Sequence, residues 1–124
     1  MEIVMWVATG FLAAAFLGAG LFKLSQPKQR LAGSGMAWVE DFSPTAIKLI
    51  AAAELAGAIG LILPPLVGIA PVLSPIAAAC LAVTMLGAII VHLRRREFRA
   101  MIPSLVLMVL AIFVAVGRFV VVPF

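Results

Sequence analysis

Apolar residues occur in four long runs that are separated by more polar segments. The runs cover about residues 3–23, 44–63, 75–93 and 102–122. A helix of about twenty residues rises roughly 30 Å, which is the thickness of the hydrocarbon core of a bilayer. The alternation of polar and apolar residues that is typical of membrane β-barrels is absent. The pattern predicts an all-α, integral-membrane, antiparallel four-helix bundle that forms a single membrane domain over residues 1–124.

Serine and proline residues predict where several of these helices begin and end. Ser43–Pro44 and Ser74–Pro75 each combine an N-cap serine with a proline at the first helical position. Pro64–Pro65 predicts the end of the second helix, and Pro103 falls in the first turn of the fourth. The segment before the first run carries Glu2 and no basic residue, so we expect a retained span rather than a cleaved signal peptide.

The composition agrees with a membrane protein and excludes several other classes. The chain is 65% hydrophobic and 11% charged, whereas soluble domains are about 45–50% apolar and about 25% charged. A soluble domain, a disordered chain and, despite the net charge of +4, a nucleic-acid-binding domain are therefore excluded. Cys80 is the only cysteine, so disulfides, CxxC pairs and cysteine-based zinc sites are excluded as well. With a single histidine, we expect no metal site and no cofactor.

Basic residues predict the orientation in the membrane. Lys28 and Arg30 lie in the first loop, and the third loop, 94–99, is rich in arginine, whereas residues 64–74 carry no charge. Cytoplasmic loops carry the excess of Lys and Arg. We expect loops one and three in the cytoplasm and both termini outside, in the cytoplasmic (inner) membrane of a bacterium. The basic loops would also attract anionic lipids of that leaflet.

The first loop, residues 24–43, is the one long connection. Trp38 and Phe42 are four residues apart, so a short helix would place both on one side. Gly33 and Gly35 disfavour such a helix. Two interpretations stay open: a cytoplasmic interfacial connector, or a lid over a cavity on the cytoplasmic side.

Small residues recur at fourfold spacing within the runs. Such faces allow transmembrane helices to approach one another closely, so they support a compact bundle. They are Gly10, Ala14 and Gly18 in the first run, Ala53 and Gly57 in the second, and Ala111 and Ala115 in the fourth.

Four ionisable residues within or at the ends of the runs are the candidates for function, because a charge inside a membrane is costly and usually faces the bundle interior. Glu54 lies roughly 15 Å beyond Pro44, and Arg118 lies roughly 22 Å from the inner side. Depth therefore predicts a deep Glu54–Arg118 pair and a second pair, Lys23 with His92, at the inner rim. Each residue also has a structural alternative. A Glu54–Arg118 pair would only fix the register of the helices, Lys23 would only extend to the membrane interface, and His92 would only cap the basic inner rim.

Four segments resemble the DoxX-like family of small membrane proteins. They are GLFKL at 20–24, AELAGAIGLILP at 53–64, GAIIVHLRR at 87–95 and Gly117–Arg118. The resemblance implies a four-helix membrane core with Lys23, Glu54, His92 and Arg118 as pattern residues. The family is named after a subunit of a thiosulfate:quinone oxidoreductase, and relatives are linked to redox or detoxification systems.

These observations favour a protein that binds a lipophilic small molecule, such as a quinone, and assists a redox or detoxification system together with a membrane partner or a second copy of itself. The expected binding residues are Lys23, Trp38, Glu54, His92 and Arg118. One alternative is a cofactor-free isomerase or cyclase with Glu54 as acid/base and Arg118 as anion stabiliser. A second alternative is a proton-coupled exporter of small molecules.

Overall fold

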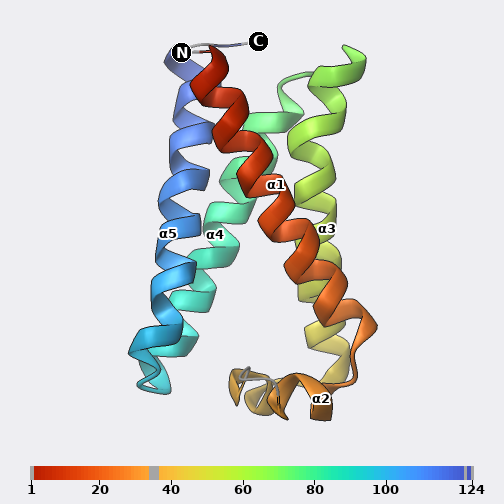
Figure 1. Ribbon diagram of the computed structural model, residues 1–124, viewed down its shortest axis with the longest axis vertical. Coiled ribbons are helices and arrows are strands. Elements are labelled where there is room, and N and C mark those ends of the chain that lie inside the picture. Colours follow the sequence, from red (N-terminus) through yellow and green to blue (C-terminus); the bar gives the residue numbers. More distant parts are fainter. Residues whose placement is uncertain (1, 34–36, 122, 124) are drawn as a thin grey trace.

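The protein is a bundle of long helices, and short helices occur in the connection between the first two of them (Figure 1). The computed structural model describes residues 2–33, 37–121 and 123, and within these ranges it contains helices and no strand. Four of the helices are long and apolar enough to cross a membrane. The all-α four-helix fold expected from the sequence is thus confirmed. The elements are α1 (Glu2–Ser25), α2 (Lys28–Gly33), the 3-10 helix η1 (Ala37–Asp41), α3 (Pro44–Val67), α4 (Leu73–Arg94), α5 (Phe98–Val116) and its π-helical continuation η2 (Gly117–Val121).

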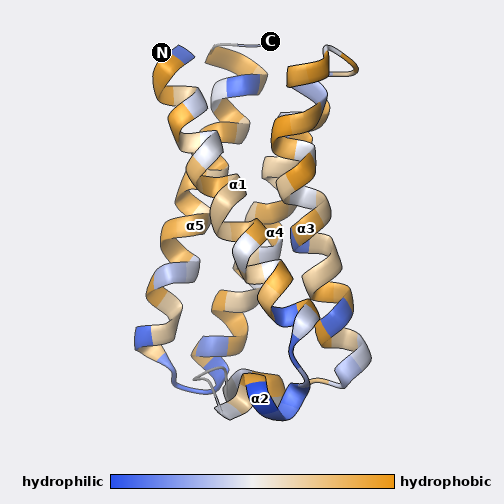
Figure 2. Cartoon of the chain, turned by 45° about the vertical axis from the view of Figure 1, so that its right-hand side comes forward, coloured by the Kyte–Doolittle hydropathy of each residue, from blue (hydrophilic) through white to orange (hydrophobic). Residues whose placement is uncertain are grey.

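The four long helices pack as two antiparallel pairs, α1 with α3 and α4 with α5, and α3 also packs on α4. Helix α1 meets α5 near the end that carries both termini and diverges from it toward the other end (Figure 1). That other end is formed by α2, η1 and the α4–α5 turn, and we call it the basic end. Hydrophilic residues gather there, whereas the walls of the bundle are mainly hydrophobic (Figure 2).

Two apolar cores hold the bundle together. The larger core joins all four long helices and includes Met5, Phe16, Leu61, Leu81 and Val114. The smaller core consists of Leu31, Val39 and Ile47, and it fixes α2 and η1 against the beginning of α3. Burial of each such side chain contributes about 1.5–3 kcal/mol where water is the alternative. The described parts of the first loop are therefore packed helical segments.

The start of α3 is as expected, but its end is not. Ser43 caps the helix, and its hydroxyl accepts a hydrogen bond from the Ala46 amide. The prediction that Pro64–Pro65 ends the helix is wrong, because α3 continues to Val67 and ends at Gly68 in the left-handed conformation. A proline lacks the amide hydrogen that the helix needs. The carbonyl of Leu61, four residues before Pro65, instead accepts a hydrogen bond from the hydroxyl of Ser74, 2.7 Å away.

The starts of α4 and α5 also differ from expectation. Helix α4 begins at Leu73 with Val72 as its N-cap, so the prediction of Ser74 as a cap is wrong. The Ser74 hydroxyl is engaged on α3 instead. Helix α5 begins at Phe98, which places Pro103 beyond the first turn.

The small residues divide into buried and outward-facing groups. Ala111 and Ala115 are buried as expected. The stripe of Gly10, Ala14 and Gly18 is exposed, and a Cβ at either glycine would meet no other atom within 4 Å. The prediction that this stripe packs inside the bundle is therefore wrong. Helix α1 approaches α3 closely at Gly20 instead, where a Cβ would lie 3.0 Å from the Ala51 carbonyl oxygen.

Candidate functional site

A cavity of about 500 Å³ lies at the basic end, between the α1–α3 pair and the α4–α5 pair. Its walls are mainly apolar, and a few polar side chains reach it from different elements. The lining residues used below are Phe16, Lys23, Trp38, Phe42, Glu54, Thr84, Ala88, His92 and Ser104. Four of the five expected site residues, Lys23, Trp38, Glu54 and His92, are thereby brought together.

Lys23 and Glu54 form an ion pair in the wall of this cavity. The Nζ of Lys23 lies 2.5 Å from Oε1 of Glu54, and only 1% of Glu54 is exposed. A buried charge needs such a partner, because desolvating an unpaired one costs several kcal/mol. The pair joins the C-terminal end of α1 to α3.

The expected pairing of Glu54 with Arg118 is therefore wrong, and the stagger of the helices explains why. Lys48 Nζ donates hydrogen bonds to the carbonyl oxygens of Lys23, Leu24 and Gln26, at 2.7–2.8 Å. The end of α1 thus lies level with Lys48, more than one turn inside the start of α3. Glu54 is six residues further along, roughly 9 Å, which the side chains of Lys23 and Glu54 span together.

Trp38 and Phe42 cover the cavity at the basic end. Their rings pack edge to face with centroids 5.5 Å apart. The Lys23 ammonium lies 5.5 Å from the centroid of the Trp38 ring, which is within range of a cation–π contact. Both residues line the cavity, as the lid interpretation expects, and η1 together with Phe42 is called the lid below.

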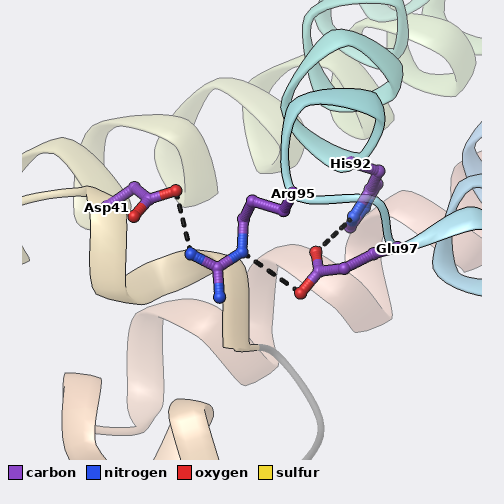
Figure 3. A network of polar contacts seen from close by, with 4 residues as sticks. All are labelled: Asp41, His92, Arg95 and Glu97. Carbon is purple, nitrogen blue, oxygen red and sulfur yellow. Dashed lines mark hydrogen bonds and ion pairs between the residues drawn. The ribbon is translucent and has the colours of Figure 1, made fainter.

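A chain of polar contacts joins the lid to the α4–α5 turn (Figure 3). Asp41, at the end of η1, is 2.9 Å from Arg95, which also contacts Glu97 at 3.1 Å. Glu97 in turn is 3.1 Å from Nδ1 of His92. The hydrogen bond from His92, with that from Arg95, holds the pKa of the Glu97 carboxyl below its usual value, against the opposing effect of desolvation.

Two hydroxyl groups add to the polar lining. Thr84 donates a hydrogen bond to the carbonyl of Cys80, one turn earlier in α4. Ser104 is buried on α5, and within the described ranges its hydroxyl has no hydrogen-bond partner in the protein. Among the same residues, no three His, Cys, Asp or Glu side chains lie together as metal ligands would.

Arg118 lies at the opposite end of the bundle and outside the cavity lining. Its guanidinium forms two hydrogen bonds to Glu2, at 2.7 and 3.1 Å, and lies 5.6 Å from the centroid of the Trp6 ring. The arginine is buried, whereas the side chain of Glu2 is 57% exposed. The four ionisable candidates therefore fall into two separate groups: Lys23, Glu54 and His92 line the cavity, and Arg118 lies at the other end.

The sequence left several contributors to the site without a role. Lys48 received no role in the site, although its ammonium caps the end of α1. Asp41 received none either, and the loop 94–99 counted only as basic, although Asp41, Arg95 and Glu97 link the lid to His92. Thr84 and Ser104 offered a usable signal, because each is an isolated polar residue within an apolar run.

Comparison with known proteins agrees with this architecture. The sequence model of the DoxX-like family matches residues 7–114, which is most of the chain and includes all or most of each of the four long helices. No curated protein and no solved structure matches the chain. The matched range contains Lys23, Glu54 and His92, whereas Glu2 and Arg118 fall outside it. This integral membrane protein belongs to the DoxX-like family.

Proposed function

We propose that the cavity at the basic end binds a lipophilic small molecule that carries polar groups. The observation that carries the proposal is the convergence of buried polar side chains from α1, α3, α4 and α5 on one mainly apolar cavity of about 500 Å³. Ligand sites typically measure about 300–1,000 Å³ and combine apolar walls with a few polar groups that orient the ligand.

A quinone-type ring with part of its tail is a ligand of suitable size and chemistry. The resemblance to the DoxX-like family is the reason to consider quinones first, in a redox- or detoxification-linked accessory that works with a membrane partner or a second copy. By the positive-inside rule, the basic end faces the cytoplasm and both termini face outward, in a bacterial inner membrane. The cavity then opens at the level of the inner leaflet.

Cofactor-free catalysis is the second candidate, because Glu54 and His92 both line the cavity. A carboxylate and an imidazole could move a proton on a bound isomerase or cyclase substrate. Arg118 cannot serve there as the expected anion stabiliser, since it is paired with Glu2 at the other end. The ammonium of Lys23 would take that role.

Extraction of bound molecules from the purified protein tests the proposed function. The wild-type protein and two variants are purified in mild detergent, and organic extracts are compared by mass spectrometry. Ala88→Phe fills the cavity, whereas Ala52→Phe adds the same ring at an exposed position outside it. We expect one or a few lipophilic compounds to be enriched in the wild type and Ala52→Phe and lost from Ala88→Phe. Equal extracts from all three would contradict the proposal.

A further inference from the structure

The α4–α5 wall of the cavity offers two hydrogen-bond acceptors, on His92 and Thr84, beside the hydroxyl of Ser104, which can donate or accept. The carboxylate of Glu97 can only accept, so Nδ1 of His92 carries the proton of their 3.1 Å contact. In the neutral imidazole, Nε2 then holds a lone pair, and no protein group of the described ranges donates to it. Thr84 uses its hydroxyl proton on Cys80, which leaves its oxygen as an acceptor.

The α1–α3 wall offers both an acceptor and a donor. Oε1 of Glu54 accepts from Lys23, whereas in the described part of the chain no protein donor contacts Oε2. Lys23 keeps further ammonium hydrogens after this contact. A group that both donates to Glu54 and accepts from Lys23 would match this wall.

We propose that the cavity selects aromatic alcohols, phenols and hydroquinones, over molecules of the same shape that carry only carbonyl or ether oxygens. This inference rests on the proposed function and names the ligand class of the same site. A hydroxyl group can donate to Glu54 and accept from Lys23 at one wall, and a second hydroxyl can donate to His92 at the other. The rings of Phe16, Trp38 and Phe42 in the lining suit an aromatic body.

A ligand that carries only carbonyl oxygens would form hydrogen bonds with only some of the polar groups that line the cavity. A quinone oxygen can accept from Lys23 or from the hydroxyl of Ser104, but it offers no hydrogen to Oε2 of Glu54, Nε2 of His92 or the oxygen of Thr84. Covering these acceptors without a donor removes their access to water and leaves them unsatisfied, which is more costly than the bond itself is favourable. Sites built to bond a hydroxyl therefore discriminate strongly against analogues that lack it.

A matched set of three probes tests this selectivity on the wild-type protein. The probes share one ring with a short alkyl tail and differ in carrying two hydroxyls (hydroquinone), two carbonyls (quinone) or two methoxy groups (dimethyl ether). Binding to the purified protein in detergent is measured by isothermal titration calorimetry under anaerobic conditions, and Ala88→Phe corrects for partitioning into micelles. The chain has one histidine, so ¹⁵N NMR of labelled histidine reports His92 alone.

We expect the hydroquinone to bind at least fivefold more tightly than either other probe and to be the only one that shifts the ¹⁵N resonance of Nε2. A smaller difference, or tighter binding of the quinone or the ether, would overturn the selectivity while the proposed function stands. Absence of saturable, Ala88→Phe-sensitive binding for all three probes would overturn both.

Discussion

The Nζ of Lys23 lies 2.5 Å from Oε1 of Glu54, at the point where the C-terminal end of α1 packs against α3. The same lysine contacts the ring of Trp38 in the lid. This residue thus joins a transmembrane helix pair to the cover of the cavity. The ion pair both stabilises the bundle and presents polar groups to a ligand.

Breaking this pair from one side should destabilise the protein more than removing it altogether. Lys23→Met or Glu54→Leu alone leaves one charged partner buried without its counterion, which we expect to cost about 3 kcal/mol. The double variant Lys23→Met/Glu54→Leu leaves no unpaired charge and should regain most of this loss. Unfolding of the four proteins in mixed micelles of increasing SDS content measures the difference. Additive losses in the double variant would contradict the coupling.

Substitution of Glu2, the carboxylate that pairs with Arg118, should leave ligand binding unchanged. This pair lies at the opposite end of the bundle, and neither residue lines the cavity, so Glu2→Gln removes no group that a ligand in the cavity could contact. We expect it to alter the affinity for a cavity probe by less than twofold, whereas Glu54→Gln weakens binding at least fivefold. Calorimetric titration of both variants with the alkyl hydroquinone decides this. A matching loss in Glu2→Gln would show that the two polar groups act as one site.

Substitution by alanine should affect stability very differently at two glycines of α1. A Cβ at Gly20 would lie 2.8 Å from Cγ of Leu55 and 3.0 Å from the carbonyl oxygen of Ala51, so Gly20→Ala forces α1 away from α3. Overpacking of this kind costs about 1–3 kcal/mol. Gly18→Ala meets nothing within 4 Å and should be neutral or slightly stabilising. The same SDS titration compares the two, and equal effects would refute the close crossing at Gly20.

The α4–α5 turn should make stability depend on pH in the acid range. The pKa of Glu97 is lowered from 4.5 in the folded state, mainly by its hydrogen bond to His92. A carboxyl with a lowered folded pKa stabilises the fold above its unfolded pKa, and this contribution is lost as the pH falls through the folded pKa.

Glu97→Gln removes this titration. We therefore expect the wild type to exceed Glu97→Gln in thermal stability at pH 6 and the difference to shrink as the pH falls below 4.5. Thermal unfolding of both proteins between pH 6 and 3 measures it. A difference that stays constant across this range would show that Glu97 does not contribute through its charge.

The hydrophobic pattern was sufficient to predict the fold, whereas the partners of the charges depended on details that the pattern does not contain. Four apolar runs could satisfy their backbones in a membrane only as helices. The stagger of α1 against α3 is set by contacts such as that of Lys48 with the carbonyl of Lys23, and this stagger decides that Glu54 meets Lys23. Depth counted from Pro44 could not reveal it.

Local structure beyond the helix pattern was also out of reach. The Pro64–Pro65 pair looked like a helix end because the sequence does not show that Ser74 bonds to the carbonyl left without a partner. The stripe through Gly10 and Gly18 looked like a packing face, although the rotation of α1 turns it outward. Which face of an almost uniformly apolar helix is buried depends on its neighbours, because the hydrophobic pattern hardly differs between the faces.

Photoaffinity labelling tests the existence of the ligand site most directly. A lipophilic phenol with a small diazirine is irradiated with the protein in bilayer nanodiscs, and labelled residues are mapped by mass spectrometry. We predict labelling concentrated on α4 and α5 around Ala88 and Ser104 and on the lid at Trp38, suppressed by excess unlabelled phenol and absent from Ala88→Phe. Labelling spread over the outward faces of the helices, insensitive to competitor and to Ala88→Phe, would contradict a binding cavity at the basic end.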